Sequence, residues 1–478
     1  MRHPSVAVIG TGFGGLAAAI ELKRSGINDL VIFERGPDVG GVWRENTYPG
    51  AACDVPSPYY SFSFEPNRNW PRRFSRQPAI LDYLRDVATK YDLHRHIRFR
   101  TEVTAAHYDD ATRTWRIRTG DGVVEVDALV SAVGQLSRPA WPDIPGREAF
   151  RGAAFHSARW DHDVELAGKR VAVIGTGASA VQFVPEIQPE VAHLTLFQRS
   201  PAYLVPRSDT EFGHRAFRRV RAAQLIERAV WWGFSEAVTL SFLYSEVLSR
   251  ALTAYSRRHM ERQVPDPDLF KKVWPQYPIG CKRMLFSGDY LPALTRSNVD
   301  LVDTGIKSIH PGGVTDAAGA FHEVDVIIYG TGFTASDFLA PLNVTGIGGR
   351  DLREQWSRNG AHAYLGISVP HFPNLYLMYG PNTNVGAGSI VFMLEQQAEH
   401  LTQAIRHSAR AGNPIAVRPE VAESFDAEIQ RRLADSVWTK CTSWYRDATG
   451  RISTNWPGTS LEYRRRTTFR PSDYEPIA

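Results

Sequence analysis

Cysteine is scarce in this sequence of 478 residues, which contains only Cys53, Cys281 and Cys441. Three widely spaced cysteines, with no C-x-x-C pair, exclude a disulfide scaffold and a cysteine-based zinc site. They also exclude redox enzymes that act through two neighbouring cysteines. Free thiols are typical of a reducing compartment, so we expect a cytoplasmic protein without a metal site.

Long apolar runs and blocks of like charge are also missing. The most apolar stretch, AVWWGFSEAVTLSFLYSEVL at 229–248, carries Glu236 and Glu246 and is too polar for a membrane span. It predicts a helix that faces the core, with contact to a membrane surface as the alternative. Lys and Arg (55) are dispersed along the chain and nearly balanced by Asp and Glu (51), which argues against a nucleic-acid partner. We expect no signal peptide before the apolar segment VAVIG at 6–10.

What the sequence does contain is a glycine-rich loop near its start. VAVIG leads into Gly10-x-Gly12-x-x-Gly15, an amphipathic helix and a second apolar segment that ends at Glu34. In a Rossmann-like unit these glycines permit a tight turn, admit a pyrophosphate and let the helix pack on the strand. A carboxylate about 20 residues further on accepts hydrogen bonds from a ribose diol. The pattern predicts an FAD site formed by Gly10, Gly12, Phe13, Gly14, Gly15 and Glu34.

The same pattern recurs in KRVAVIGTGASAVQFVPEIQPEVAHLTLFQRS at 169–200. Gly175, Gly177 and Ala180 occupy the three small positions, and Arg199 followed by Ser200 replaces the acid. A guanidinium binds a 2′-phosphate with two hydrogen bonds, whereas a carboxylate would repel it. The second unit is therefore predicted to prefer NADPH over NADH, and to bind it through Gly175, Thr176, Gly177, Ala178, Ser179, Ala180, Arg199 and Ser200.

Two further strands with glycine turns, ALVSAVGQLSRP at 128–139 and VDVIIYGTGF at 324–333, flank the second unit. We expect both to complete the first domain. The sequence therefore predicts an α/β protein with two dinucleotide-binding Rossmann-like domains. An NADP-binding domain at 150–325, with a helical excursion at about 211–275, is inserted into a discontinuous FAD-binding domain made of 1–149 and 326–478.

Four further segments carry a family resemblance. FRGAAFHSARWD at 150–161 has the pattern F-x-G-x-x-x-H-x-x-x-W-D, and GGVWRENTYPGAACD at 40–54 has the pattern G-G-x-W-x-x-x-x-[F/Y]-P-G-x-x-x-D. YPIGCKRMLFSGDYLPAL at 277–294 and TSWYRDATGRISTNWPG at 442–458 agree with them. Together with both glycine loops, they make the sequence resemble the type I Baeyer–Villiger monooxygenases, class B flavoprotein monooxygenases related to the flavin-containing monooxygenases. The last segment departs from the family's WY-x-G-x-N pattern, near the substrate pocket.

The resemblance implies an NADPH- and O2-dependent enzyme that turns a ketone into an ester or lactone through a flavin peroxide. A fixed cation would favour the peroxide anion, which attacks carbonyls, and would stabilise the resulting oxyanion. The family places this cation at Arg283 and its acidic partner at Asp54. It assigns Lys282 to the 2′-phosphate, and Trp444 to the nicotinamide ribose and the border of the substrate pocket. The implied FAD-lining residues are Val42, Trp43, Asp54, Tyr60 and Val103.

The resemblance places His156 and Trp160 on a linker between the domains. There they would couple domain motion to the cofactors rather than transfer protons. The alternative is a buried histidine bonded to the backbone and a tryptophan that only packs. Structural alternatives also exist for three other residues: a solvated charge for Arg283, a turn cap for Asp54 and ordinary packing for Trp444.

Two alternative functions share parts of this pattern. An N- or S-oxygenating flavin monooxygenase would have the same folds and cofactors, but the Trp160-Asp161 ending and the predicted pairing of Asp54 with Arg283 favour the ketone reaction. A flavin–NADPH electron-transfer reductase, passing electrons to a partner protein, would not need Arg283. A small-molecule ketone and O2 are therefore the expected partners, with FAD and NADPH as cofactors.

Overall fold

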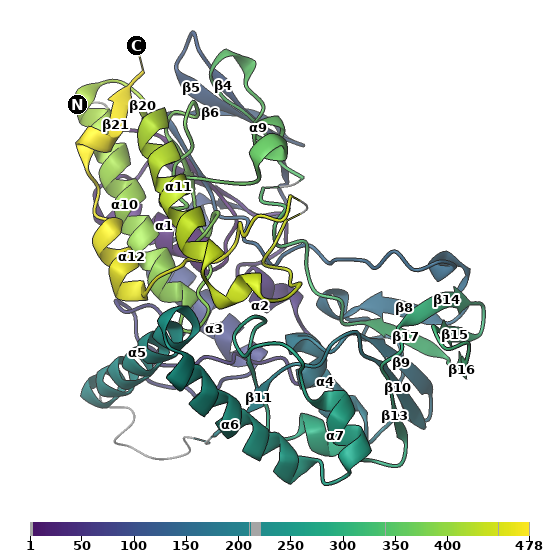
Figure 1. Ribbon diagram of the computed structural model, residues 1–478. Helices are drawn as coiled ribbons and strands as arrows, with labels where there is room; N and C mark the ends of the chain where they lie inside the picture. Colours follow the sequence, from purple (N-terminus) through teal and green to yellow (C-terminus); the bar gives the residue numbers. More distant parts are fainter. Residues whose placement is uncertain (1–2, 210, 212–220, 340, 448, 478) are drawn as a thin grey trace.

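The computed structural model describes residues 3–209, 211, 221–339, 341–447 and 449–477. Two parallel five-stranded sheets form the centres of two α/β units, and the second unit lies at the lower right of Figure 1. The first sheet has the order β19-β7-β1-β2-β3, with strands at Leu375–Leu377, Ala128–Ser131, Val6–Ile9, Leu30–Phe33 and Ile97–Arg98. The second has the order β13-β10-β9-β17-β8, with strands at Val299–Val302, His193–Phe197, Arg170–Ile174, Val326–Tyr329 and Ala153–His156. The predicted α/β fold class is confirmed.

Each parallel sheet has helices on one face and a smaller sheet on the other. Apolar residues of the first sheet pack on α1 (Phe13–Arg24) and α10 (Ile390–Ala411). Its other face packs on the sheet β18-β4-β5-β6, with strands at Asn343–Thr345, Val103–Asp109, Thr114–Thr119 and Gly122–Val126. The second sheet lies between two helices, α4 (Ala178–Ile187) and α8 (Tyr290–Leu294), and the meander β14-β15-β16 at Ile306–His310, Gly313–Asp316 and Phe321–Glu323. Because both faces are covered, the inner strands β1, β7, β9 and β17 are almost wholly apolar.

The strand of VDVIIYGTGF does not lie where the sequence led us to expect it. It forms β17, which pairs with β8 and β9 in the second sheet, so its assignment to the first domain is wrong. The return strand of the first sheet is β19 instead. An apolar strand followed by a glycine turn suits either sheet, and long-range contacts decide between them. Here Asp325, just before β17, accepts hydrogen bonds from the backbone and guanidinium of Arg170 at the start of β9.

The predicted helical excursion consists of α5 (Arg221–Tyr244), α6 (Glu246–Gln263) and α7 (Pro267–Val273), while its residues 212–220 lie outside the described part of the chain. The apolar stretch at 229–248 is divided between α5 and α6, because Ser245 caps the second helix. Trp231 and Trp232 of α5 pack against the core of the first unit, whereas Met260 of α6 belongs to the core of the second. The excursion therefore bridges the two units.

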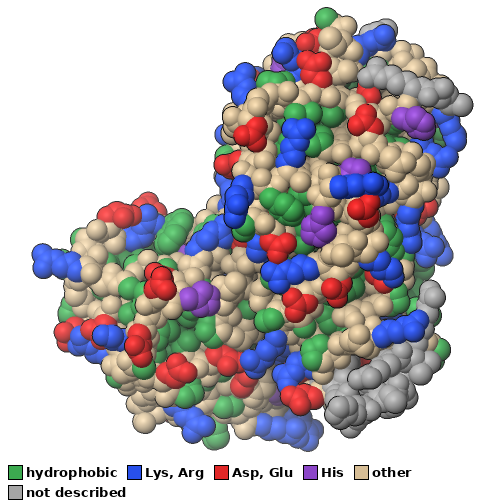
Figure 2. All heavy atoms as spheres, turned by 180° about the vertical axis from the view of Figure 1, so that it is seen from behind, with side chains coloured by type: hydrophobic (Ala, Val, Ile, Leu, Met, Phe, Trp, Pro, Cys, Tyr) green, Lys and Arg blue, Asp and Glu red, His purple; other side chains and the backbone are tan. Residues whose placement is uncertain are grey.

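The outer face of α5 carries exposed apolar side chains, among them Val230 and Phe234. The prediction that this segment faces the core is therefore correct for one side of the helix and wrong for the other. Among the described residues, no helix has the length and apolar character needed to cross a membrane. Figure 2 shows positive and negative side chains interspersed over the face opposite to that of Figure 1.

The remaining elements complete the first unit and the site. Short strand pairs are formed by β11 with β12 and by β20 with β21. Of the other helices, α11 and α12 lie beside α10 in Figure 1. The bounds of these helices and short strands are α2 Val42–Glu45, α3 Gln77–Lys90, α9 Leu352–Asn359, α11 Pro419–Ala434, α12 Ser460–Arg466, β11 Leu204–Val205, β12 Leu285–Phe286, β20 Ile415–Val417 and β21 Tyr474–Pro476.

The prediction of three free cysteines is wrong for two of them. Cys281 and Cys441 form a disulfide across 160 residues of sequence, and their Cα atoms lie 6.1 Å apart. Only Cys53 is a free thiol, and it is buried. Cysteine spacing indicates local pairs such as C-x-x-C, whereas this pair is brought together by the tertiary fold.

Candidate active site

The first glycine loop has the geometry that its sequence predicts. Gly10 has a φ of 102°, and a Cβ at this position would lie 2.6 Å from the carbonyl oxygen of Ala132. A Cβ on Gly15 would lie 1.9 Å from the carbonyl oxygen of Gly10, so only glycine lets α1 pack this close to the loop. Gly12 begins α1, whose first N–H groups have no side-chain cap. Uncapped N–H groups at a helix start form a ready site for a pyrophosphate.

Glu34, at the end of β2, closes the first loop. Its Oε2 accepts hydrogen bonds from the backbone N and the Oγ1 of Thr11, at 3.1 and 2.6 Å. Its Oε1 accepts from the backbone N of Gly36 at 2.7 Å and lies 2.9 Å from Nη1 of Arg44. The carboxylate is buried, at 4% exposure, and borders the cavity described below. Glu34 therefore presents a buried and fixed carboxylate at the edge of the cavity.

The second glycine loop repeats this geometry. Gly175 has a φ of 108°, and a Cβ there would lie 2.4 Å from the carbonyl oxygen of Gly330, which follows β17. Gly177 begins α4, again without a side-chain cap, and a Cβ on it would meet nothing within 4 Å. Ala180 is fully buried and packs towards Gly330, so a methyl group suffices where the first loop needs glycine.

Two cations, Arg199 and Lys282, lie beyond the end of strand β10 in the second unit. Nζ of Lys282 donates a hydrogen bond to Oγ of Ser200 at 2.7 Å, and Oγ1 of Thr176 donates to the backbone carbonyl of Ser200 at 3.0 Å. Burial lowers the pKa of the Lys282 ammonium, and repulsion from Arg199 lowers it further. An anion placed between Arg199 and Lys282 would relieve this repulsion, which is the charge arrangement that a 2′-phosphate requires.

Asp54 and Arg283, 229 residues apart in sequence, form a forked ion pair. Nε of Arg283 donates to Oδ2 of Asp54 at 3.0 Å, and Nη2 donates to Oδ1 at 2.9 Å and to Oδ2 at 2.8 Å. The pairing inferred from the family resemblance is therefore present. The charge of Asp54 raises the pKa of Arg283, so the guanidinium stays protonated. Among the described residues, its Nη1 group has no hydrogen-bond partner.

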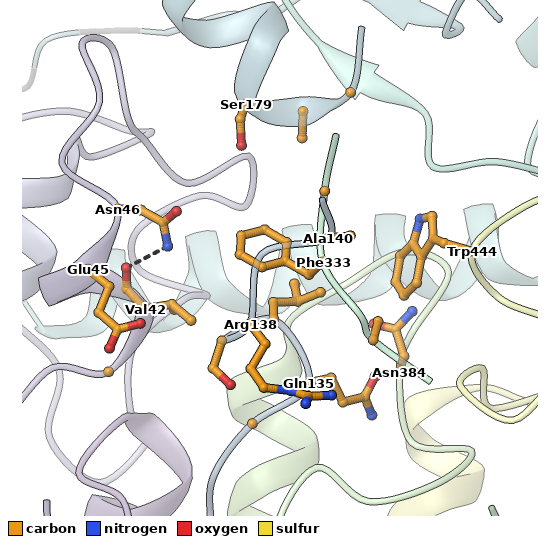
Figure 3. Close-up of a pocket in the computed structure, with 18 of the residues that line it drawn as sticks. Val42, Glu45, Asn46, Gln135, Arg138, Ala140, Ser179, Phe333, Asn384 and Trp444 are labelled. Atoms are coloured by element: carbon orange, nitrogen blue, oxygen red, sulfur yellow. Dashed lines mark hydrogen bonds between the residues drawn. The ribbon is translucent and has the colours of Figure 1, made fainter. Parts of the chain in front are cut away.

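Both loops and the ion pair border one large cavity of about 970 Å³. Figure 3 shows Ser179 at the start of α4 on one side of it, with Val42 and Asn46 on a second side. Trp444 and Asn384 lie on the side opposite Val42, and Phe333 lies between these two sides. The predicted site residues that line the cavity are Gly10, Gly12, Phe13, Gly14, Glu34, Val42, Trp43, Asp54, Tyr60, Val103, Gly175, Thr176, Gly177, Ala178, Ser179, Arg199, Ser200, Lys282, Arg283 and Trp444.

Four predicted residues lie outside the cavity. Gly15 and Ala180 act through helix packing, as described above. His156 is fully buried behind the wall, where its ring packs edge-on against Trp141, which does line the cavity. Its Nδ1 accepts a hydrogen bond from the backbone N of Ala158, and burial lowers its pKa to about 4, so it is neutral near pH 7. Trp160 packs against Phe155 and Phe183.

Sequence reasoning missed a polar chain on the Trp444 side of the cavity. The hydroxyl of Tyr379 donates to Oδ1 of Asn384 at 2.8 Å, and Nδ2 of Asn384 donates to Oδ1 of Asn455 at 2.8 Å. Tyr379 and Asn384 line the cavity, and Asn455 is fully buried behind them. The signal was present in GPNTNVG at 380–386, a turn-forming cluster directly after a buried strand.

The chemistry of the donors fits two dinucleotides. Each loop offers an uncapped helix start for a pyrophosphate, one with an acid and the other with two cations beside it. Both open into the same cavity, whose volume is at the upper end for ligand sites. The two nucleotides could therefore meet near the ion pair of Asp54 and Arg283.

Comparison with known proteins agrees with this reading. Residues 3–342 match the family described as flavin-binding monooxygenase-like. The chain is 45% identical over 473 residues to a Baeyer–Villiger monooxygenase of Streptomyces coelicolor, covering 98% of this chain and 91% of that protein.

Solved structures match over the whole fold. A structure of OTEMO in complex with FAD and NADP superposes with a TM-score of 0.89 and 27% identity, covering 100% of each chain. Cyclohexanone monooxygenase with bound epsilon-caprolactone superposes with a TM-score of 0.87 and 28% identity, covering 99% of each chain. This chain therefore belongs to the flavin-binding monooxygenase-like family and, within it, to the Baeyer–Villiger monooxygenases, enzymes that use FAD and NADPH.

Proposed function

We propose that this enzyme inserts one oxygen atom from O2 beside the carbonyl of a small-molecule ketone, and that Arg283 is the fixed cation at the reacting centre. Bound FAD, reduced by NADPH, supplies the activated oxygen. The observation that carries the proposal is the forked pair of Asp54 and Arg283 inside the cavity that both glycine loops share. A surface charge or a turn cap would not need this placement.

Asp54 has a positioning role in this proposal. It occupies Nε and Nη2 of Arg283, which sets the plane of the guanidinium, and Nη1 has no hydrogen-bond partner among the described residues. Attack on a ketone carbonyl places negative charge on the carbonyl oxygen. A preorganised cation with a free N–H group stabilises that charge without having to reorient. Because Asp54 raises the pKa of Arg283, this cation persists over the whole working pH range.

The two nucleotides are assigned to the two units by the residues at their strand ends. FAD is proposed to lie along the first loop with its ribose at Glu34. NADPH is proposed to lie along the second loop, with its 2′-phosphate between Arg199, Ser200 and Lys282. Trp444, 38% exposed and facing the cavity from the opposite side, is suited to the nicotinamide end. His156, which is fully buried, and Trp160, which is partly buried, are proposed to couple motion of the two units.

The domain division follows from the same assignment. We place the FAD domain on the first sheet and the NADP domain on the second, which then runs through β17 rather than ending at 325. The cytoplasmic location stays a prediction, and the disulfide between Cys281 and Cys441 removes the thiol argument for it.

The alternative is an enzyme that oxygenates nitrogen or sulfur with the same cofactors. The test incubates the FAD-loaded enzyme with NADPH and O2, and with either a cyclic ketone or an aryl sulfide, and identifies the products. We expect a lactone formed in proportion to the NADPH oxidised. Sulfoxide without lactone from any ketone of a panel would favour the heteroatom reaction. Oxidation of NADPH without an oxygenated product from either class would favour an electron-transfer reductase.

A further inference from the structure

The disulfide between Cys281 and Cys441 joins two walls of the cavity. Cys281 directly precedes Lys282 and Arg283, and Cys441 lies three residues before Trp444. We refer to residues 277–284 as the Arg283 loop and to residues 441–444 as the Trp444 loop. Both loops contribute side chains to the lining of the cavity. The bond is therefore placed where it can set the distance between Arg283 and Trp444.

The Arg283 loop is held firmly by the second unit. The hydroxyl of Tyr277 donates to the carbonyl oxygen of Pro201 at 2.6 Å, and the hydroxyl of Tyr203 donates to the carbonyl oxygen of Tyr277 at 2.7 Å. Cys281 is fully buried. The ion pair with Asp54 adds a further link to this loop. It therefore acts as the fixed end of the disulfide.

The Trp444 loop has few attachments of its own. Within the described part of the chain, residues 441–444 take part in one hydrogen bond. The backbone N of Arg446 donates it to the carbonyl oxygen of Ser443 at 3.2 Å. Among the described residues, the one aromatic ring in contact with Trp444 is that of its neighbour Tyr445, with centroids 4.4 Å apart. None of these contacts reaches the second unit. The disulfide is therefore the covalent attachment of this loop to the Arg283 loop, and the buried ring of Tyr445, which interacts electrostatically with Arg283, follows it in the chain.

We propose that the disulfide between Cys281 and Cys441 positions Trp444 opposite Arg283, and that its reduction releases the Trp444 loop while both glycine loops keep their structure and FAD stays bound. Trp444 then no longer closes its side of the cavity. Ketone is held less well, and more of the NADPH consumed ends as hydrogen peroxide. The catalytic part of this inference depends on the function proposed above, whereas the release of the loop does not.

Opening of the bond is a two-electron step that needs a dithiol reductant. A thiolate of the reductant attacks Sγ of Cys441, which is partly exposed, and Cys281 leaves as the thiolate. The neighbouring charges of Lys282 and Arg283 stabilise this leaving group. The second thiol of the reductant then displaces Cys441, so the reductant becomes a disulfide and both cysteines end as thiols. Two electrons and two protons pass from the reductant to the protein.

The first test counts thiols and probes the loop without any turnover. The full-length protein is incubated with or without dithiothreitol, then denatured and alkylated. We expect one alkylated cysteine, Cys53, without reductant and all three with it. Native samples are also treated with trypsin. Cleavage after the exposed Lys440 should become several-fold faster on reduction, because local release exposes the backbone. Cleavage after Arg113, in an exposed turn of the β4–β5 hairpin, is the control and should not change.

The second test measures turnover with the ketone used above. Reduction of the wild-type enzyme should raise KM for the ketone and lower the ester or lactone formed per NADPH several-fold, with FAD content unchanged. Cys441→Ser should reproduce this state without reductant, because residue 441 is partly exposed and accepts a hydroxyl. Dithiothreitol should then have no further effect on Cys441→Ser, which separates the bond from other actions of the reductant.

Three results would overturn the proposal. One is three alkylated cysteines in the protein before any reductant is added. Another is a reduced enzyme whose cleavage after Lys440 stays as slow as before. The third is unchanged coupling and KM on reduction, in an enzyme that does form ester or lactone. If no ketone reacts at all, the proposed function fails, and the cleavage experiment still decides whether the disulfide holds the loop.

Discussion

The two glycine loops share a backbone and differ in the charge at their open end. Gly10 and Gly175 have φ values of 102° and 108°, and a Cβ on either would lie within 2.6 Å of a carbonyl oxygen that follows the neighbouring strand. In both, the following helix starts without a side-chain cap. The backbone therefore forms the same pyrophosphate cradle twice, and it carries no information about which nucleotide binds.

The difference lies in how each loop is completed. Glu34 is tied back to its own loop by Thr11 and Gly36, so the first site is made from one short stretch of chain. The second loop is completed differently, because Lys282 from a distant segment of the chain reaches Ser200, the neighbour of Arg199. Since Arg283 follows Lys282 in the chain, the proposed assignments place the 2′-phosphate contact and the cation at the reacting centre on one loop. On that proposal, nucleotide recognition and chemistry are joined in the second unit.

Removal of Arg283 is expected to have the largest effect. Arg283→Ala should still bind FAD and oxidise NADPH, while formation of ester or lactone falls by a factor on the order of 10²–10³ because one preorganised stabiliser of the oxyanion is lost. The measurement is product formed and hydrogen peroxide released per NADPH oxidised. Arg283→Lys keeps the charge without the planar fork and should restore part of the activity. Near-normal coupling in Arg283→Ala would remove Arg283 from the mechanism.

Removal of Arg199 should affect recognition alone. A charge-assisted hydrogen bond contributes roughly 1.5–3 kcal/mol, so Arg199→Ala should raise KM for NADPH by about 10–100-fold. KM for NADH should hardly change, because NADH has no 2′-phosphate. Steady-state kinetics with both nucleotides checks this on one preparation. An equal loss with NADPH and NADH would show that Arg199 does not contact the 2′-phosphate.

The smallest effect concerns the pH dependence of the second site. The pKa of Lys282 is lowered by burial and by Arg199, so this side chain loses its charge at a lower pH than an ordinary lysine. The charged form attracts a phosphate, so KM for NADPH should rise as the pH rises through this pKa, whereas KM for NADH should stay level. Lys282→Arg, which stays charged, should remove the rise. A parallel rise for NADPH and NADH in the wild-type enzyme would assign it to another group.

Local patterns were predictable from the sequence, and long-range pairings were not. Gly10, Gly12 and Gly15 could be predicted because their spacing between a strand and a helix is a local pattern, although the oxygen atom closest to a Cβ on Gly10 belongs to the distant Ala132. The strand at 326–329 was misplaced because its apolar pattern fits either sheet, and its partner Arg170 lies 155 residues before Asp325. The disulfide between Cys281 and Cys441 was missed for the same reason.

The ion pair shows where a family resemblance adds to physical reasoning. Composition and spacing indicated only that Asp54 follows a turn and that Arg283 stands between apolar and glycine-rich segments. Their pairing was inferred from two long motifs, and the structure brings them within 3.0 Å. Tyr379 and Asn384 belong to none of the motifs that carry the resemblance, and they meet Asn455, from the segment at 442–458, only in the folded protein.

The assignment of one nucleotide to each loop is tested most directly by a pair of matched variants, Gly12→Val and Gly177→Val. A Cβ on Gly12 would meet only Cα of Gly41, at 3.7 Å, and one on Gly177 would meet nothing within 4 Å, so both variants should fold. The added methyl groups would occupy the pyrophosphate cradle. The measurement is FAD content and NADP⁺ affinity in the same purified samples. Gly12→Val should lose FAD, whereas Gly177→Val should keep its FAD and bind NADP⁺ weakly. Full FAD occupancy in Gly12→Val, or loss of FAD from Gly177→Val with NADP⁺ binding intact, would contradict the account.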